Sequence, residues 1–359
     1  MNVKNSPPVG GVRGTQYKFS HASTMVYFDA SFAQLGKLAD KKNTIILTDE
    51  NIFAAHTPKL KSWKTIVLKA GEEYKVQSTV DHIIQQLIRL QADRKTTLVG
   101  MGGGVITDIT GYVASVYMRG IAFGFVPTSL LAMVDASIGG KNGIDAGVYK
   151  NMVGVIRQPH FLLYDIGLLK SLPDAEWQNG FAEIIKHACI KDAAMFALLE
   201  KNDLQTFQKN KKGMAALVAR NAKIKIKVVQ EDEFEKGERK LLNYGHTLGH
   251  ALENQYQLSH GHAVSIGMGY AAEISRQLMG FTQTERLVKV IHQYGLPAFT
   301  KFDTEQVFAV LKMDKKRERK DISYILLEKI GKGIIKSIPL KELENIIGKI
   351  KIPLLGTGV

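Results

Sequence analysis

The sequence predicts a protein of two parts: an α/β domain with a mainly parallel, Rossmann-like sheet in residues 1–165, and an all-α domain in residues 166–359. Three observations support this fold class. The chain has 359 residues, which is more than a typical single domain. Short β-rich runs alternate with helical patterns in its first half. From Ile166 onward, helical runs and loops follow one another.

Five short runs rich in β-branched and aromatic residues are expected to form strands. These runs are Thr44–Thr48, Thr65–Leu68, Thr96–Val99, Ile121–Val126 and Phe161–Tyr164. Between the second and third runs, residues 76–90 form a helical pattern with one apolar face, made of Val80, Ile83, Ile84, Leu87 and Ile88. Strands that alternate with helices favour a parallel sheet with covered faces, and such sheets bind ligands at the carboxyl ends of their strands.

The chain is strongly basic. Its 48 Lys and Arg residues exceed its 34 Asp and Glu residues, which gives a formal charge of +14. The basic residues are dispersed, however, and the densest run, 315–320, is interrupted by Glu318. No helix-turn-helix, zinc-finger or aromatic-basic pattern accompanies them. We therefore expect no nucleic-acid partner, and instead a small-molecule substrate that carries phosphate and carboxylate groups.

The sequence carries no signal for a membrane or for export. Its N-terminal residues are polar and rich in Pro and Gly, and Gly, Lys or Asp interrupts every long apolar stretch. The single cysteine, Cys189, excludes an internal disulfide and suits a reducing compartment. These features predict a cytoplasmic protein with no membrane partner.

A glycine-rich turn follows the third predicted strand. Gly102, Gly103 and Gly104 precede a predicted helix whose first turns hold Asp108. Consecutive glycines let backbone N–H groups approach a pyrophosphate at the N-terminus of a helix. The dinucleotide pattern G-x-G-x-x-G is imperfect, because Thr107 occupies its last glycine position. A phosphate-binding turn is the favoured interpretation, and a plain strand-to-helix turn is the alternative.

Residues 127–145 read PTSLLAMVDASIGGKNGID, which is too polar and glycine-rich for a core element. This stretch carries Asp135 and Lys141, and Lys150 and Asn151 follow it. Lys and Asn side chains among glycines are suited to donate hydrogen bonds to a phosphate. Each alone would more often be a surface residue, so the interpretation depends on their clustering beside the glycine turn.

A helix predicted after residue 174 offers a carboxylate that is suited to bind a metal. Its pattern places Glu183, Lys186 and His187 on one face. The carboxylate would complete a metal site with histidines from elsewhere, or it would pair with the lysine on the surface. Sequence spacing leaves both alternatives open.

Residues 243–262 hold four of the ten histidines of the chain. His246 and His250 stand four apart, so both imidazoles leave one face of a helix, and Gly245 and Gly249 allow a close approach to that face. A catalytic zinc needs three protein ligands and an open position. The segment predicts part of such a site, and the alternative is a hydrogen-bonded histidine pair followed by an exposed turn.

Taken in order, these motifs resemble those of the 3-dehydroquinate synthase family over nearly the whole chain. The resemblance rests on GGGVITDITGYVAS, YMRGI, VPTSLLAMVDASIGGKNGID, KNMVG, GFAEIIKHA, LLNYGHTLGHALE and HGHAVSIGM. It implies an NAD-binding α/β domain, a helical domain, an active site between them with zinc (cobalt is an alternative), and a homodimer. The implied enzyme is a carbon–oxygen lyase of the shikimate pathway.

The implied reaction converts 3-deoxy-D-arabino-heptulosonate 7-phosphate into 3-dehydroquinate and phosphate. NAD takes up a hydride transiently, phosphate leaves by β-elimination, the hydride returns, and an intramolecular aldol step closes the ring. Three rivals remain open: a related cyclase that acts on sedoheptulose 7-phosphate or glucose 6-phosphate, a metal-dependent alcohol or glycerol dehydrogenase, and a basic nucleic-acid-binding protein.

Transferred residue by residue, the resemblance assigns roles along the chain. It implies the metal ligands Glu183, His246 and His260. It implies cofactor contacts at Asp49, Asn51, Glu72, Lys75, Gly103, Gly104, Asp108, Thr128, Ser129, Asp135, Lys141 and Lys150. The implied catalytic groups are Asp135, Lys186, Lys225, Arg239 and His250. Further substrate contacts would be Arg119, Lys141, Asn151, Asn243 and one of Lys315 and Lys316.

The implied tasks of these residues differ, and two positions depart from the family pattern. The substrate phosphate would be held by Lys141, Asn151, Asn243 and His250, and the carboxylate by Lys225 and Arg239. Arg119 would reach the phosphate of the substrate that is bound to the neighbouring subunit. His262 stands where the family often has Glu, and we expect it near the metal without binding it. Tyr149 stands where a glycine commonly precedes the Lys-Asn pair.

Overall fold

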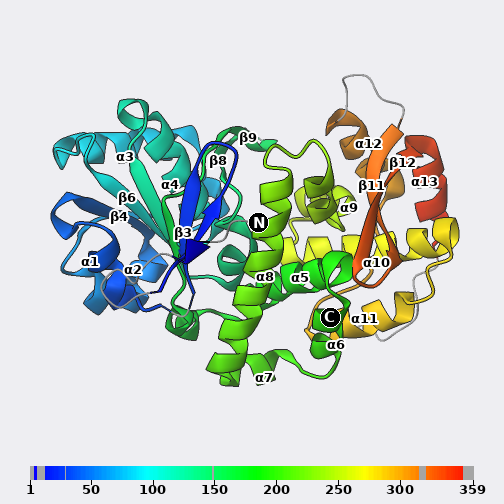
Figure 1. Cartoon of the computed structure of the whole chain (residues 1–359). Helices are drawn as coiled ribbons and strands as arrows, with labels where there is room; N and C mark the ends of the chain where they lie inside the picture. The colour runs from blue at the N-terminus through cyan, green and yellow to red at the C-terminus, as the bar shows by residue number, and fades with distance from the viewer. Residues whose placement is uncertain (1–3, 6–12, 29, 148, 315–320, 351–359) are drawn as a thin grey trace. The chain divides into compact units, whose positions relative to one another are not determined.

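The computed structural model describes residues 4–5, 13–28, 30–147, 149–314 and 321–350, and the chain divides into two compact units (Figure 1). Unit 1 comprises Met1–Trp177 and Asn210–Phe234, and unit 2 comprises Gln178–Lys209 and Glu235–Val359. Each unit is therefore discontinuous in sequence. The predicted division into 1–165 and 166–359 has one boundary, so it does not assign residues 210–234 to the first domain. The roles of the two predicted domains stay a prediction.

Unit 1 is built on an eight-stranded sheet with the spatial order β1-β2-β3-β10-β7-β6-β4-β5. The strands from β3 to β5 in this order are parallel, whereas β2 pairs antiparallel with β3 and with β1. The bounds are β1 Lys4–Asn5, β2 Thr15–Lys18, β3 Ser23–Tyr27, β4 Thr44–Asp49, β5 Lys64–Leu68, β6 Thr97–Gly102, β7 Ala122–Pro127 and β10 Phe161–Leu163. The five predicted strands and the mainly parallel sheet are confirmed.

Helices cover this sheet, and a small second sheet packs on one of them. α4 packs on β4, β6 and β7, and the antiparallel pair β8–β9 packs on α4. The bounds are η1 Phe32–Gln34, α1 Leu35–Leu38, η2 Lys41–Asn43, α2 Glu50–Leu60, η3 Glu72–Tyr74, α3 Gln77–Arg89, α4 Gly104–Val116, η4 Tyr117–Arg119, η5 Ala132–Ala136, β8 Lys141–Ala146, β9 Tyr149–Ile156, η6 Ile166–Ser171 and α8 Lys211–Glu231. Of the predicted apolar face of α3, Val80, Ile83 and Leu87 are buried and Ile84 is half-buried. The prediction is wrong for Ile88, which is 61% exposed.

The order of the parallel strands reverses between β4 and β6, since the chain leaves β4 for β5 on one side and continues with β6 on the other. In doubly wound sheets, ligands bind beside the carboxyl ends of the strands at such a reversal. The carboxyl ends here are Asp49 of β4 and Gly102 of β6, and Pro127 ends the adjacent β7. Topology therefore places the glycine turn at the expected ligand-binding edge.

The prediction that residues 127–145 lie outside the core is wrong. Leu130, Met133 and Val134 are fully buried, and η5 forms a π-helical turn within this stretch. Two of its polar side chains are compatible with burial because they bond to nearby backbone: Ser137 Oγ donates to Ala132 O at 2.7 Å, and Ser129 Oγ accepts from Ala132 N at 3.2 Å. Local polarity is a poor guide where side chains satisfy the backbone beside them.

Unit 2 is organised around α10, which packs against α9, α11, α13 and β11. The bounds are α5 Asp174–Lys191 (the first turn of which belongs to unit 1), α6 Ala193–Glu200, α7 Leu204–Lys209, η7 Glu238–Asn243, α9 His246–Tyr256, α10 His260–Met279, α11 Thr284–Gln293, α12 Thr304–Asp314, β11 Asp321–Lys329, β12 Lys332–Pro339 and α13 Leu340–Lys349. The predicted helical domain is confirmed, with one correction.

The correction concerns the expectation of an all-α domain, because β11 and β12 pair as an antiparallel hairpin. Its turn contains Gly331, whose φ of 87° lies in the left-handed region that glycine adopts freely. Ile322, Tyr324 and Leu326 of β11 are buried. Ile325 and Leu327 are buried as well, so residues 324–327 are buried on both faces of the strand.

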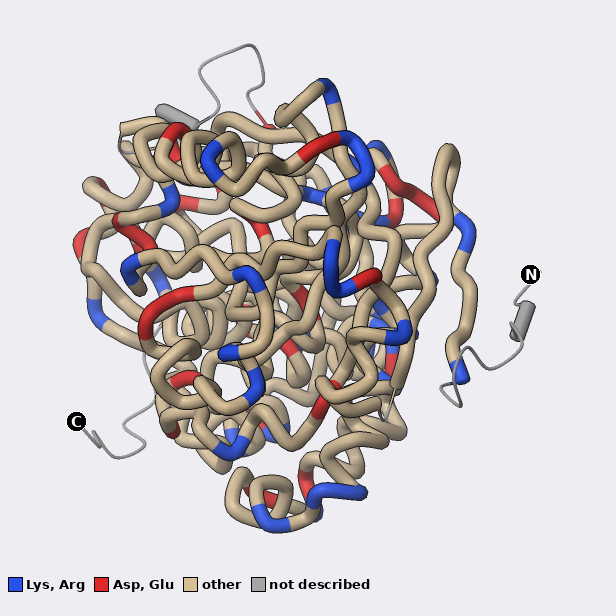
Figure 2. The backbone as a smooth tube through the Cα atoms, turned by 90° about the vertical axis from the view of Figure 1, so that its left-hand side faces the viewer, with Lys and Arg blue, Asp and Glu red and all other residues tan. Residues whose placement is uncertain are grey.

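The described part of the chain contains no helix that combines the length and apolar character needed to cross a membrane. Its charges are mixed rather than segregated: basic and acidic segments interleave along the backbone (Figure 2). The high net charge of +14 is thus spread over many elements.

Candidate active site

The buried carboxylate of Glu183 lies at the centre of a cluster in unit 2. Glu183 Oε1 lies 3.3 Å from His246 Nε2 and 2.9 Å from His260 Nε2. One ligand atom from each of the three residues lies within 4.8 Å of those of the other two. The structure therefore brings together the three residues that the family resemblance assigned to a metal. A carboxylate and two imidazoles are a donor set that fits a divalent cation such as zinc.

Contacts between three helices fix this cluster. Asn179 stands one turn before Glu183 on α5, and its Oδ1 accepts the Gly261 N–H at 2.8 Å. This bond holds the first turn of α10 on α5, and so places His260 beside Glu183. Gly245 begins α9 with a φ of 78°, and a Cβ on Gly267 would lie 1.8 Å from Gly245 O. The predicted close approach to the histidine helix is thus made by α10.

The charges around Glu183 compensate one another. Burial alone would raise the pKa of Glu183, but its ion pair with Lys186 and its contacts with His246 and His260 hold the pKa well below its ordinary value. Burial and Lys186 lower the pKa of His246. Burial would also lower the pKa of His260, but Glu183 and Glu253 outweigh it and raise the pKa to about 10. The cluster thus holds an anionic oxygen toward two imidazole nitrogens.

Other residues predicted for substrate lie close to this cluster in sequence or in space. The ring of His250 lies one turn beyond that of His246, with a centroid separation of 5.1 Å, so the predicted common face of the pair is confirmed. Arg239 is buried in η7. Asn243, at the end of η7, donates from Nδ2 to Glu235 Oε1 at 2.7 Å. Their roles toward a substrate stay predictions.

The glycine turn of unit 1 leaves polar groups available to a ligand. Gly103 is the N-cap of α4; no side chain caps this helix end, and no acidic residue lies in its first turn. Free N–H groups at a helix N-terminus attract anions. The buried Thr128 Oγ1 has no hydrogen-bond partner among the described residues. The residues at this edge therefore fit a phosphate-containing cofactor.

A buried ammonium, Lys75, joins three segments beside this turn. Lys75 Nζ lies 2.7 Å from Asp108 Oδ2 of α4 and donates to Asn151 Oδ1 of β9 at 2.6 Å. Glu72 Oε1 lies 3.7 Å away. Asn151 N in turn donates to Asp145 Oδ1 at 2.6 Å. The residues predicted for cofactor (Glu72, Lys75 and Asp108) and for substrate (Asn151) thus form one network.

The predicted catalytic residues Asp135 and Lys225 form a second pair in unit 1. Lys225 Nζ, on α8, donates to the backbone oxygen of Asp135 at 2.7 Å and lies 2.8 Å from Asp135 Oδ1. The lysine is buried, whereas the aspartate is partly exposed. An ammonium held in this way is fixed in position for a further oxygen ligand.

The remaining predicted residues differ in their exposure and in their local tasks. Asp49 caps α2 by accepting from Ile52 N at 3.0 Å, which is a structural task in its own right. Asn51, Lys141, Lys150 and Arg119 are exposed. His262 is half-buried in the first turn of α10 and does not belong to the Glu183 cluster. Lys315 and Lys316 lie outside the described residues.

Sequence reasoning missed two residues that position this site. Asn179 fixes the first turn of α10, and Glu253 faces the second ring nitrogen of His260. One signal was available for each, since Asn179 stands four residues before Glu183 and Glu253 seven residues after His246, spacings that share a helix face.

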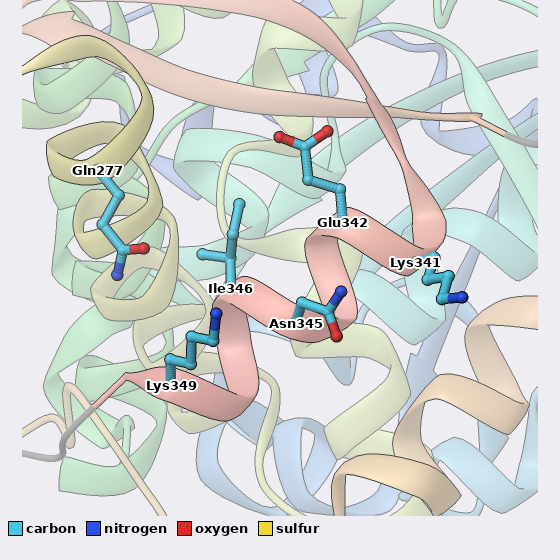
Figure 3. Close-up of a pocket in the computed structure, with 6 residues that line it drawn as sticks. All are labelled: Gln277, Lys341, Glu342, Asn345, Ile346 and Lys349. Atoms are coloured by element: carbon cyan, nitrogen blue, oxygen red, sulfur yellow. The ribbon is translucent and has the colours of Figure 1, made fainter.

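A separate hollow of about 410 Å³ lies in unit 2 between α10 and α13 (Figure 3). It is lined by Gln277, Lys341, Glu342, Asn345, Ile346 and Lys349. These side chains include none of the predicted site residues. The hollow is therefore distinct from the Glu183 cluster.

Unit 1 has a doubly wound sheet and a helix N-terminus without a side-chain cap, and unit 2 has a Glu-His-His cluster. These features are typical of metal-dependent enzymes with a nucleotide-binding sheet. Sequence models of the N-terminal and C-terminal parts of 3-dehydroquinate synthase match residues 65–179 and 180–317. The chain belongs to the 3-dehydroquinate synthase family, and it is an enzyme of the lyase class.

Known proteins agree with this assignment. The 3-dehydroquinate synthase of Campylobacter concisus (strain 13826) is 39% identical over 325 residues, covering 86% of this chain and 92% of that protein. The structure of 2-epi-5-epi-valiolone synthase from Streptomyces hygroscopicus subsp. jinggangensis 5008, with NAD+ and Zn2+ bound, is 26% identical with a TM-score of 0.83, covering 92% of this chain and 97% of that one.

A second solved structure is 2-deoxy-scyllo-inosose synthase complexed with carbaglucose-6-phosphate, NAD+ and Co2+. It is 25% identical with a TM-score of 0.82, covering 93% of this chain and 99% of that one. Both structures confirm the predicted fold class. The higher identity to the 3-dehydroquinate synthase favours the predicted activity over the related cyclases.

Proposed function

We propose that this chain converts 3-deoxy-D-arabino-heptulosonate 7-phosphate into 3-dehydroquinate and phosphate, with NAD and zinc (or cobalt) as cofactors. The observation that carries the proposal is the convergence of Glu183, His246 and His260 in a chain of this family. When bound, the metal supplies Lewis-acid polarisation of a substrate hydroxyl, and NAD supplies transient hydride transfer. The single, buried Cys189 is in keeping with the reducing cytoplasm.

The residues of unit 1 would hold the cofactor. The N–H groups at the start of α4 would bind its phosphates, and the unpaired hydroxyl of Thr128 would find a partner in it. Ser129 lies beside this turn, because a Cβ on Gly103 would be 3.4 Å from Ser129 Oγ. The remaining contacts proposed for the cofactor are Asp49, Asn51, Glu72, Lys75, Gly104, Asp108, Asp135, Lys141 and Lys150.

The cationic groups would hold the anionic substrate. Lys225 is fixed by Asp135, and Lys186 by Glu183, so both ammonium groups are oriented before any ligand arrives. Charge-assisted hydrogen bonds from such groups are stronger than neutral ones. Arg239 would contribute to binding of the carboxylate, and His250 would bind the phosphate or move a proton.

The direct test is an assay with NAD+, zinc and the heptulosonate phosphate, in which phosphate and dehydroquinate are measured together. We expect equal amounts of both products and no accumulation of NADH, because the hydride returns to the substrate. Accumulation of NADH without phosphate release would instead indicate a dehydrogenase. Turnover of sedoheptulose 7-phosphate in place of the acid substrate would indicate a related cyclase.

The homodimer is proposed from one exposed apolar surface of unit 1. β9 exposes Tyr149 by 59% and Met152 by 60%, and Met118 of η4 is 43% exposed. Arg157, directly after β9, donates to Ala114 O and Ile121 O, so the end of β9 lies next to η4. Met152 and Ile156 point to the same side of β9, and we call Val116, Met118, Met152 and Ile156 the β9 face.

We propose that a second copy of this chain covers the β9 face. The apolar face would lose its contact with water, and the exposed Arg119 of η4 would lie at the interface, as its predicted role requires. Light scattering coupled to gel filtration should give a dimer mass for the wild type and a monomer mass for Met152→Asp. Ile88→Asp, which changes an isolated residue of α3 that is 61% exposed, is the matched control and should stay dimeric. A monomeric wild type would contradict the proposal.

A further inference from the structure

The imidazole of His260 is held between two carboxylates. Its Nε2 lies 2.9 Å from Glu183 Oε1, and its Nδ1 lies 3.6 Å from Glu253 Oε2. Glu253 belongs to α9, and its side chain is only 10% exposed. It stands seven residues after His246, so both lie on one face of α9, two turns apart. The same helix therefore provides one imidazole and the carboxylate that faces the other.

His246 has a different partner at its second ring nitrogen. Its Nδ1 lies 3.2 Å from the backbone oxygen of Tyr244. A carbonyl oxygen only accepts hydrogen bonds, so Nδ1 carries the proton and the Nε2 lone pair points toward the side of Glu183. A neutral oxygen thus supports the Nδ1 of His246, whereas an anionic oxygen faces the Nδ1 of His260.

We propose that Glu253 is a positioning residue that accepts the Nδ1 proton of His260, fixes the tautomer in which Nε2 is the ligand atom, and strengthens that nitrogen as a donor to a divalent cation. This inference rests on the proposed function, because the cation at Glu183 is part of it. Carboxylates that hold metal-binding histidines in this way typically change metal affinity by about 10-fold to 100-fold.

The test is the zinc affinity of Glu253→Gln, measured by competition with a chromogenic chelator. The amide keeps the size of the side chain and one accepting oxygen, but it removes the charge. We expect zinc to bind about 10-fold more weakly or worse, and the visible absorption of the cobalt-loaded protein to shift. Glu273→Gln is the matched control, since Glu273 lies on α10 and pairs with Arg276 at 2.7 Å. It should bind zinc as the wild type does.

The outcomes separate this inference from the proposed function. A wild type that binds no zinc overturns the metal site itself. A wild type that binds zinc, together with a Glu253→Gln variant within about twofold of it, overturns the role of Glu253, because a purely structural side chain would leave the affinity unchanged. If Glu253→Gln folds poorly, Glu253→Asp and Glu253→Ala replace it. Glu253→Asp keeps the charge and should then bind zinc more tightly than Glu253→Ala does. Equal zinc affinities of these two variants would overturn the inference.

Discussion

Unit 1 buries a cation among oxygen atoms, whereas unit 2 buries an anion among nitrogen atoms. Lys75 is 4% exposed and is surrounded by Glu72, Asp108 and Asn151. Glu183 is fully buried and faces Lys186 and two imidazoles.

The two clusters differ in whether their polar groups still need a hydrogen-bond partner or a metal ion. An ammonium donates three hydrogen bonds and needs no further partner once oxygens surround it. Two imidazole lone pairs that converge on a carboxylate need a proton or a metal ion between them. The Lys75 network is thus suited to join segments of the chain, and the Glu183 cluster to bind a cation.

The largest expected effect comes from removing a ligand in unit 2. Glu183→Gln or His246→Ala should reduce turnover on the order of 10³-fold or more, because the Lewis acid is lost with its site. Metal analysis of the purified variants should find little zinc. His292→Ala changes an exposed histidine of α11 and serves as the control. Full activity with normal zinc content in either variant would refute the assignment.

A smaller effect is expected from removing the buried cation of unit 1. Lys75→Met leaves Asp108 without its ion pair, and breaking a buried pair costs about 3–5 kcal/mol. Because Asp108 is 18% exposed, we expect the lower end of this range. Urea denaturation measures the change in the free energy of unfolding. Lys95→Met, at an exposed loop position, should change it by less than about 0.5 kcal/mol. Equal stability of the two variants would show that the network does not join the segments.

The smallest effect is a pH dependence at Asp108. Burial raises the pKa of this carboxyl to about 6 despite the opposing effect of Lys75. A raised pKa means that the folded state holds the proton more tightly than the unfolded state does. The stabilisation is therefore present below the ordinary pKa and is lost as the pH rises through about 6.

The unfolding free energy of the wild type should accordingly fall relative to Asp108→Asn as the pH rises from about 4 to above 6, by up to about 3 kcal/mol. Thermal or urea unfolding of both proteins over this range measures the difference. A difference that stays constant with pH would show that Asp108 titrates normally.

Local sequence patterns predicted the elements of unit 1 better than their packing. The β-branched runs identify five parallel strands because buried strands need such residues on both faces. The burial of residues 127–145 was missed, since it depends on bonds such as that of Ser129 Oγ to its own turn. The β11–β12 hairpin was missed because residues 324–327 form a continuous buried apolar run, and periodicity alone does not distinguish such a strand from a buried helix.

The site also could be predicted only in part from local sequence patterns. Helical spacing places His246 and His250 on one face, and their rings are indeed neighbours. It could not show that Glu183 meets His260, 77 residues later in the chain, because this contact depends on Asn179 holding α10 against α5. Only the resemblance to a family provided that pairing in advance.

The assignment of α8 to unit 1 has a consequence for biosynthesis. α8 packs against η5 and η6, yet residues 178–209 of unit 2 precede it in the chain. A ribosome that has synthesised Met1–Trp177 has therefore not yet made the helix that packs on η5 and η6. The nascent chain must wait for about 60 further residues, and a fragment cut after Trp177 would expose an unfinished core to chaperones and to aggregation.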